Sequence, residues 1–111
     1  MTEPNAAVVT FRKSIISSVD DIAVTSNQLT DFIREHQPKK LIFDFQGVKF
    51  FSSQVLGLLL EMRAKLRDHG GEVIISSINP QLHRVFKITN LDQVFRFYPD
   101  RQTAVAAAQT G

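Results

Sequence analysis

Apolar residues recur along the chain with two different spacings, one typical of strands and the other typical of helices. Strands are predicted over 7–11, 14–17, 40–45, 72–76 and 94–98, the second of them after a tight turn at residues 12 and 13. In the strand over 40–45, Leu41, Phe43 and Phe45 face one side and Ile42 faces the other. Apolar residues on both sides favour a central strand that is covered on both faces. The residues that follow it, 46–51, are expected to form a loop.

Helical spacing predicts four helices, over 25–36, 53–68, 79–90 and 100–108. End signals accompany each of them: Pro38 after the first, Gly70 and Gly71 after the second, Asn79 with Pro80 opening the third, and Asp100 capping the fourth. The second helix carries an apolar stripe at positions 55, 56, 59, 62 and 66, which Arg63 interrupts. The buried stripe of the third helix is predicted to consist of Leu82, Val85, Phe86 and Ile88.

The order of these elements indicates the class of fold. Strands that alternate with helices favour a sheet of mostly parallel strands covered by helices. We therefore expect a single α/β domain over 7–109, with a mixed, mostly parallel sheet of four to five strands and about four helices. Residues 1–6 are expected to form a flexible N-terminal tail. A chain of 111 residues has room for one core of this size.

Composition narrows the setting in which such a domain works. The chain has no cysteine, which excludes disulfides, thiolate nucleophiles and cysteine-rich metal sites. The first residues lack the pattern of a signal peptide, and the longest apolar stretch, 55–60, is too short to span a bilayer. We therefore expect a cytoplasmic protein without a membrane partner. The formal net charge is only +2 and the basic residues are scattered, so nucleic acid is not an expected partner either.

The sequence offers no support for catalysis, a cofactor or a metal. His36, His69 and His83 are isolated, and none has a second ligand at metal-binding spacing on the same helical face. No glycine-rich phosphate-binding motif is present, and the serine motif GxSxG of α/β-hydrolases is absent. We therefore expect no catalytic residues, no cofactor and no enzyme activity.

Ser52 and Ser53 form a candidate modification site at the predicted start of the second helix. One of them is expected to be the N-cap, whose hydroxyl accepts a hydrogen bond from a first-turn N–H. Such a serine also lies at the carboxyl edge of the sheet, where α/β domains engage ligands and partners. The positive end of the helix would tolerate a phosphate there, whereas an interface over it would gain up to about two negative charges. The pair is therefore a candidate switch for protein binding.

The segment KKLIFDFQGVKFFSSQVLGLLLEMRAKLRDHGGEVIISSINPQLHRVFKITNLDQVF resembles the STAS domain of bacterial anti-sigma factor antagonists. Shared features are an acidic residue in the strand, a loop of the type Gly-Val-x-Phe, a serine at the helix start, a Gly-Gly turn, and a segment like Thr89–Phe95 after the next helix. The resemblance covers residues 39–108 and implies the STAS fold for the domain.

The resemblance also implies a function and the residues that perform it. Members of the family bind an anti-sigma factor that is a serine kinase of the histidine-kinase-like ATPase type, and phosphorylation of the motif serine ends the binding. Ser53 stands at the phosphoacceptor position, with Ser52 as the alternative, and Asp44 matches the acidic residue of the strand. Leu56 and Gly57 match a Leu-Gly pair of the motif. Asp20 and Asp21 fall near an acidic loop that lies beside the phosphoacceptor in the family, although either can instead cap a helix.

The chain departs from the motif of the family next to Ser53. Ser52 stands where the family has an acidic residue, and Gln54 and Val55 stand where it has Ser-Gly. We expect Val55 to add bulk to a surface that the partner approaches. The departures leave open a second hypothesis, in which the domain is an adaptor or scaffold module without phosphoregulation.

The partner-binding surface is predicted around the start of the second helix, where several apolar residues gather. Its predicted members are Phe51, Ser52, Ser53, Gln54, Leu58 and Asp21. Among the residues of the helix start, we expect Phe51, Gln54 and Leu58 to be exposed. A weak homodimer also stays open, and a nucleotide sensor on the same fold has no motif to support it.

Overall fold

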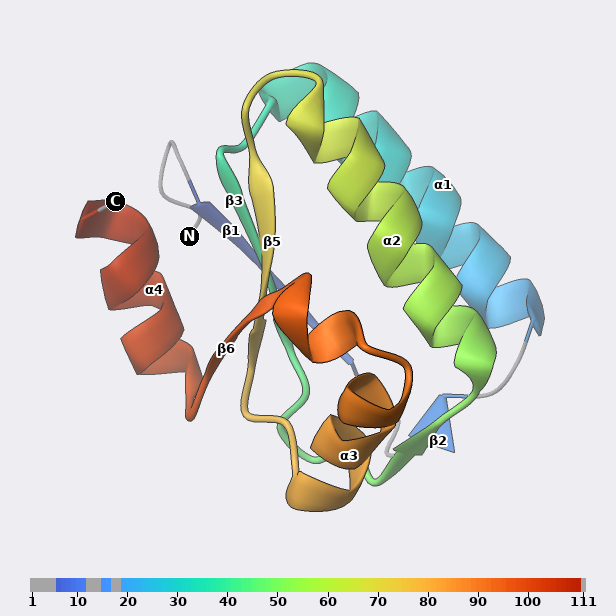
Figure 1. Cartoon of the computed structure of the whole chain (residues 1–111). Helices are drawn as coiled ribbons and strands as arrows, with labels where there is room; N and C mark the ends of the chain where they lie inside the picture. The colour runs from blue at the N-terminus through green and yellow to red at the C-terminus, as the bar shows by residue number, and fades with distance from the viewer. Residues whose placement is uncertain (1–5, 12–14, 17–18, 111) are drawn as a thin grey trace.

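The computed structural model describes residues 6–11, 15–16 and 19–110. Parallel strands form a four-stranded sheet in the order β1-β3-β5-β6, with β1 at Ala6–Thr10, β3 at Lys40–Asp44, β5 at Glu72–Ser76 and β6 at Arg96–Tyr98 (Figure 1). Two short strands, β2 at Ile15–Ile16 and β4 at Phe50–Phe51, pair in parallel as a separate sheet. The predicted α/β class with a mostly parallel sheet is confirmed, and every ladder within the described residues is parallel.

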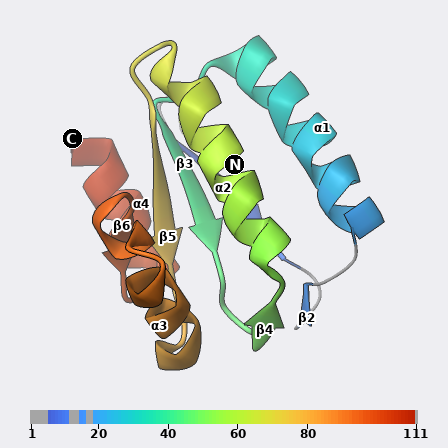
Figure 2. The same ribbon diagram turned by 45° about the vertical axis from the view of Figure 1, so that its right-hand side comes forward.

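The helices cover both faces of the larger sheet. Helices α1 (Val19–His36) and α2 (Ser53–Arg67) lie side by side on one face, and α4 (Arg101–Thr110) covers the other (Figures 1 and 2). Helix α3 (Pro80–Ile88) and the 3-10 helix η1 (Leu91–Gln93) lie between β5 and β6 in the sequence. Within the described part of the chain, no helix has the length and apolar character needed to cross a bilayer.

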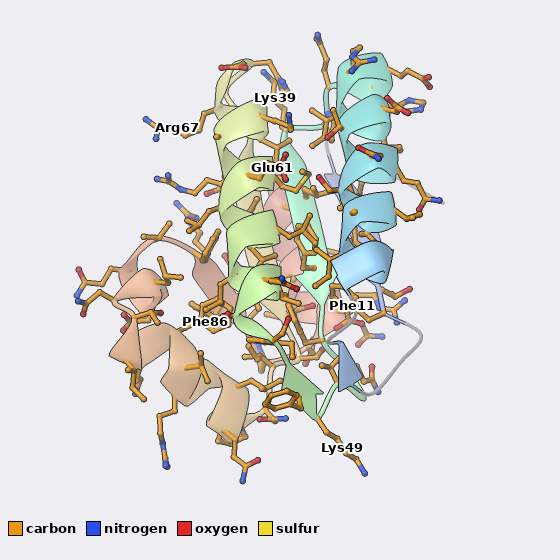
Figure 3. All side chains as sticks on the ribbon, turned by 90° about the vertical axis from the view of Figure 1, so that its right-hand side faces the viewer. Phe11, Lys39, Lys49, Glu61, Arg67 and Phe86 are labelled. Atoms are coloured by element: carbon orange, nitrogen blue, oxygen red, sulfur yellow. The ribbon has the colours of Figure 1, made fainter. Side chains whose placement is uncertain are left out.

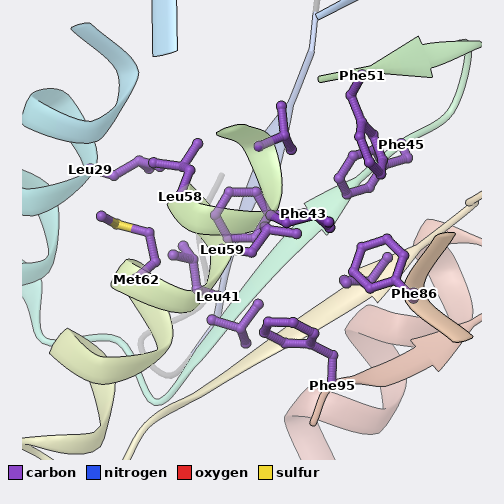
Figure 4. Close-up of a cluster of buried hydrophobic side chains, with 14 of the residues drawn as sticks. Leu29, Leu41, Phe43, Phe45, Phe51, Leu58, Leu59, Met62, Phe86 and Phe95 are labelled. Atoms are coloured by element: carbon purple, nitrogen blue, oxygen red, sulfur yellow. The ribbon is translucent and has the colours of Figure 1, made fainter. Parts of the chain in front are cut away.

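The main core fills the space between the sheet and helices α1, α2 and α3. Phe43 of β3 and Phe45 directly after it project into this core, whereas Ile42 packs on the opposite face, so the predicted two-sided burial of this strand is confirmed. Figure 4 shows Leu29 of α1 beside Leu58 of α2, on the side of the core away from Phe86 and Phe95. Burial on both faces explains why the strand carries apolar residues at successive positions.

Several element boundaries differ from the sequence-based expectation. Strand β1 begins at Ala6, one residue earlier than predicted, and Ala6 is buried beneath α4. The predicted loop over 46–51 contains β4, whose two residues are too few to give a periodic signal. The predicted second strand is present as β2, but it pairs with β4; its preceding turn at residues 12 and 13 lies outside the described residues.

Helix α1 begins at Val19, six residues before the predicted start at Thr25. The additional turns bring Ile22 against the main core, on the same side of the helix as Leu29 and Ile33. This burial favours the longer helix, although acidic residues at positions 20 and 21 had suggested a loop or a cap.

Helix α3 starts as predicted but buries a narrower stripe than expected. Its N-cap is Asn79, whose side-chain oxygen accepts a hydrogen bond from the Leu82 N–H at 2.9 Å. Leu82 and Phe86 are buried, whereas Ile88 is 74% exposed, so the prediction that Ile88 belongs to the buried stripe is wrong. At 3.6 residues per turn, Ile88 lies about 120° around the helix from Leu82, which turns it away from the sheet.

A small second core attaches α4 to the sheet. Ala104 and Ala108 of the helix pack on Ile42 and Ile74. At the edge of these contacts, the buried carboxylate of Asp44 accepts hydrogen bonds from Ser76 Oγ at 3.0 Å and from Arg101 Nε at 3.2 Å. Strand β6 is shorter than the predicted 94–98, because Val94 still closes η1, with its N–H donating to the Leu91 carbonyl oxygen at 3.0 Å.

Candidate partner-binding site

The candidate site lies where β4 leads into α2, at the end of the sheet where β3 and β5 finish. A tight turn follows β3, closed by a hydrogen bond of 3.0 Å from the Val48 N–H to the Phe45 carbonyl oxygen. Gly47 within it has a φ of 81°, which glycine adopts without strain. The Asn79 side chain donates a hydrogen bond of 3.1 Å to the Val48 carbonyl oxygen. These contacts anchor the segment that presents the two serines.

Ser52 and Ser53 occupy different environments although they are adjacent. Ser52 is the N-cap residue of α2, with φ −79° and ψ 163°, and its carbonyl oxygen accepts the Val55 N–H at 3.0 Å. Its hydroxyl makes no capping hydrogen bond; it is buried and has no partner among the described residues. The predicted serine cap is therefore wrong for the hydroxyl of Ser52. Ser53 is the first helical residue and is exposed.

Electrostatics at the start of α2 favour a negative group. The first turn of the helix contains no acidic residue, and the Ser52 hydroxyl accepts none of its N–H groups. The partial positive charge of a helix N-terminus is therefore not compensated by a side chain at the cap. An anion attached to Ser53 would interact favourably with this charge.

Two of the residues predicted at the surface are buried. Phe51 is only 5% exposed, and its ring packs edge-on against Phe45 and Phe86, with centroid distances of 5.6 and 5.9 Å. Leu58 is 4% exposed, because α1 covers the side of α2 on which it lies (Figure 4). The prediction that Phe51 and Leu58 are exposed is therefore wrong, whereas Gln54 is exposed as predicted.

The surface beside Ser53 is formed by residues that alternate with the buried ones. Phe50 points away from the core because successive strand residues face opposite sides, and it is 55% exposed. Gly57 and Leu60 continue the exposed side of α2 after Ser53. Val55 is completely buried in the main core, so the expectation that it adds bulk to a partner surface is wrong. Alternation along a strand over residues 50 and 51 would have predicted that Phe50 is exposed. That argument requires β4 to be recognised as a strand, and two residues are too few for this.

Neither of two acidic residues that the sequence linked to the site, Asp44 and Asp21, can be assigned a contact with Ser53. Asp44 faces α4, on the opposite side of the sheet from α2, where it binds Ser76 and Arg101. Asp21 belongs to the first turns of α1, and its side chain lies outside the part of the chain that the structure describes. The pairing of β2 with β4 brings the chain before α1 next to the chain before α2, so both helices start at the same end of the molecule (Figures 1 and 2).

Comparisons with known proteins agree with the fold described above. The family model of the STAS domain matches residues 3–104. The anti-sigma F factor antagonist of Paenibacillus polymyxa is 23% identical over 78 residues, which cover 70% of this chain and 67% of that relative. An anti-sigma-factor antagonist STAS domain protein from Planctomyces limnophilus has a similar structure, with a TM-score of 0.86 and 22% identity over 98% of this chain and 95% of that one.

Two more solved structures define the breadth of the fold. The unphosphorylated form of the anti-sigma factor antagonist SpoIIAA gives a TM-score of 0.84 at 16% identity, and covers 100% of this chain and 94% of that one. The STAS domain of a SulP transporter from Vibrio cholerae gives 0.76 at 19% identity, and covers 99% and 85%. At such identities the likeness establishes the fold alone, and this fold serves both regulators and transporter domains.

Proposed function

This chain belongs to the STAS domain family, and from that premise we propose that it is a regulatory protein of the anti-sigma factor antagonist kind. Its partner is an anti-sigma factor that is also a serine kinase of the histidine-kinase-like ATPase type. The unphosphorylated domain binds this partner in the cytoplasm and thereby frees a sigma factor. Phosphorylation of Ser53 by the kinase ends the binding.

The observation that carries the proposal is the difference between the two serines. Ser53 is exposed in the first turn of α2, whereas the hydroxyl of Ser52 is buried. A kinase must reach the hydroxyl that it modifies, so Ser53 is the phosphoacceptor and Ser52 is not. The uncompensated positive end of α2 accommodates the phosphate, so modification leaves the fold intact and acts on the interface.

The partner surface that we assign combines Ser53 with exposed neighbours of mixed character. Phe50 supplies an aromatic ring, Gln54 a hydrogen-bonding amide, and Leu60 an aliphatic contact. Phe51 and Leu58 support this surface from below. Up to about two negative charges from a phosphate in the middle of such a patch would have to be desolvated on binding, which weakens the complex.

Phosphorylation assays test the choice of serine. The purified protein is incubated with ATP and candidate anti-sigma kinases from its own genome, and the modified residue is located by peptide mapping. We expect a single phosphate on Ser53, full phosphorylation of Ser52→Ala, and none of Ser53→Ala. Ser52→Ala is the matched control because it removes the neighbouring hydroxyl from the same loop. Modification that follows Ser52 instead would contradict the reasoning from burial.

Binding assays test the switch. We expect Ser53→Asp to bind the kinase at least about tenfold more weakly than wild type, because a charge at a desolvated interface costs about 1.4 kcal/mol or more. Ser53→Ala should keep wild-type affinity. Equal affinity of all three proteins would refute phosphoregulation while leaving the fold assignment intact.

A second function is favoured by one specific observation, the absence of a carboxylate at the position directly before Ser53. The family has a carboxylate before the phosphoacceptor, and here the same position holds Ser52, whose hydroxyl is buried. In this alternative the domain is an adaptor or scaffold module that binds its partner permanently. It predicts that Ser53→Ala changes neither the affinity nor the phenotype, and that Ser53 from native cells carries no phosphate under any growth or stress condition.

A further inference from the structure

The outward face of α3 is polar and cationic but also carries the most exposed large apolar side chain of the described residues. Arg84, Lys87 and Ile88 are spaced three and four residues apart, so they lie on one side of the helix. All three are exposed, and Ile88 is 74% exposed. Isolated apolar residues on a surface are ordinary. An exposed isoleucine beside two cations within about one helical turn is a more specific arrangement.

The two positive charges have no counter-charge on their own helix. Helix α3 contains no acidic residue, and within the described part of the chain neither Arg84 nor Lys87 forms an ion pair. Lys87 gains from the negative end of the helix, but Arg84 lies one turn earlier and gains little. Like charges one turn apart repel each other. The nearest acidic residue downstream in the sequence is Asp92 of η1, which is half-buried.

A third cation lies near the start of the same helix. Lys49 is exposed in the turn before β4, and the hydrogen bond from Asn79 to Val48 joins this turn to the N-terminus of α3. Figure 3 shows Lys49 pointing into solvent at the end of the molecule where α3 lies, and Arg67 at the opposite end. The N-terminal end of α3 therefore also has an exposed cation at the same end of the molecule.

We infer that this α3 face, defined by Arg84, Lys87 and Ile88, is a second docking surface for an acidic protein segment. Carboxylates of the segment would pair with Arg84 and Lys87, and an apolar side chain beside them would cover Ile88. Charge complementarity of this kind fixes the register of a complex and speeds its formation. A nucleic acid would use the cations but leave Ile88 uncovered, and three cations are few for phosphate binding. The three residues of this face differ from those assigned to the surface around Ser53, so its charge and its apolar contact can be tested by separate variants.

Photo-crosslinking in native cells identifies what covers the face. A benzoyl-phenylalanine replaces Ile88 in the full-length chain, and the same residue replaces Arg67 in a control chain. We expect cross-links from position 88 to a protein segment rich in Asp and Glu that contains an apolar residue, and none of these from position 67. Cross-links to nucleic acid, to lipid, to a second copy of this chain or to a basic segment would each overturn the proposal. So would the absence of any cross-link at position 88.

Affinity measurements then test the chemistry of the contact with the captured protein. We expect the double variant Arg84→Glu with Lys87→Glu to bind at least about tenfold more weakly and to lose the salt dependence of wild-type binding. Ile88→Ala should weaken binding about fivefold or more, since buried interface anchors contribute at this level. Arg67→Glu, an exposed cation in the last turn of α2, should stay within about twofold. Equal effects of both charge reversals would refute a specific α3 surface.

Discussion

Replacement of Gly57 by alanine tests whether this glycine serves the stability of the domain or the binding of a partner. Gly57 lies inside α2, four residues after Ser53, and is exposed. A methyl group added to it would meet no atom within 4 Å, so the isolated domain has no steric reason for glycine at this position. Glycine inside a helix is less favourable than alanine because it loses more backbone freedom on folding. We therefore expect Gly57→Ala to stabilise the domain.

The size of the effect follows from helix propensity and chain length. Alanine in place of a helical glycine adds about 0.5–1 kcal/mol to the free energy of unfolding. The entropy of unfolding at the midpoint is about 2.1 cal/mol/K per residue, or about 0.23 kcal/mol/K for 111 residues. The melting temperature should therefore rise by about 2–4 °C.

Gly71→Ala provides the matched control, because that glycine has a steric role. A methyl group there would lie 2.9 Å from the Pro38 carbonyl oxygen and 3.2 Å from two carbon atoms of Leu66. A backbone oxygen yields little, so we expect a loss of about 1–3 kcal/mol. Urea denaturation of both variants beside wild type measures the two opposite shifts. A Gly57→Ala protein no more stable than wild type would refute the reasoning, and a stabilised protein with weaker partner binding would assign Gly57 to the interface.

Three further predictions concern burial, an ion pair and pH. In urea denaturation, buried Leu58→Ala should lower the free energy of unfolding by about 2–5 kcal/mol, whereas exposed Phe50→Ala should lower it by less than about 0.5 kcal/mol. Similar losses for the two variants would contradict the assigned burial. Arg101→Ala should lower the free energy of unfolding by about 1–2 kcal/mol, because it leaves the buried Asp44 carboxylate with Ser76 as its side-chain partner. Arg96→Ala removes a more exposed ion pair with Glu72 and should lower it by less than about 0.5 kcal/mol. The Thr103 backbone N–H donates a hydrogen bond of 2.7 Å to the Asp100 carboxylate, and this contact is the largest cause that lowers the pKa of Asp100 below its ordinary 3.8. The cap therefore stabilises the fold above pH 3.8, and this contribution is lost as the pH falls through the folded-state pKa. The stability difference between wild type and Asp100→Ala should therefore be largest near neutral pH and should shrink as the pH falls below 3.8, and a difference that does not change with pH would argue against this role.

The sequence predicted those parts of the fold whose signals are local. Strand β5 occupies the predicted 72–76, and the Asn79-Pro80 pair starts α3 as expected, because the cap chemistry is contained in a few neighbouring residues. Strand β4 was missed because two residues carry no period, and its existence depends on pairing with distant β2. The apolar character of Ile88 predicted burial, but its angle around the helix turns it toward solvent.

The candidate site was predicted in position but not in detail. A serine at a strand-to-helix turn could be located from the sequence. The contrast between Ser52 and Ser53 could not, since both are serines and either one suits an N-cap. The burial of Phe51 depends on Phe45 and Phe86, which come from other elements, and that of Leu58 depends on α1. Such burial is a tertiary property, and no local pattern around the helix start contains it.

The structure also changes the meaning of the departures from the family motif. Val55 is part of the core, so its replacement of a glycine alters packing beneath the helix and not the surface offered to a partner. Ser52 removes a carboxylate from the N-cap, and its hydroxyl leaves the first-turn N–H groups without a side-chain acceptor. A phosphate on Ser53 would not compete with a neighbouring negative charge for these groups, so it would be better stabilised here than beside an acidic cap. The departure at Ser52 therefore removes one element of the motif while making the helix start more receptive to phosphate, and Gln54 is the altered position that a partner can contact directly.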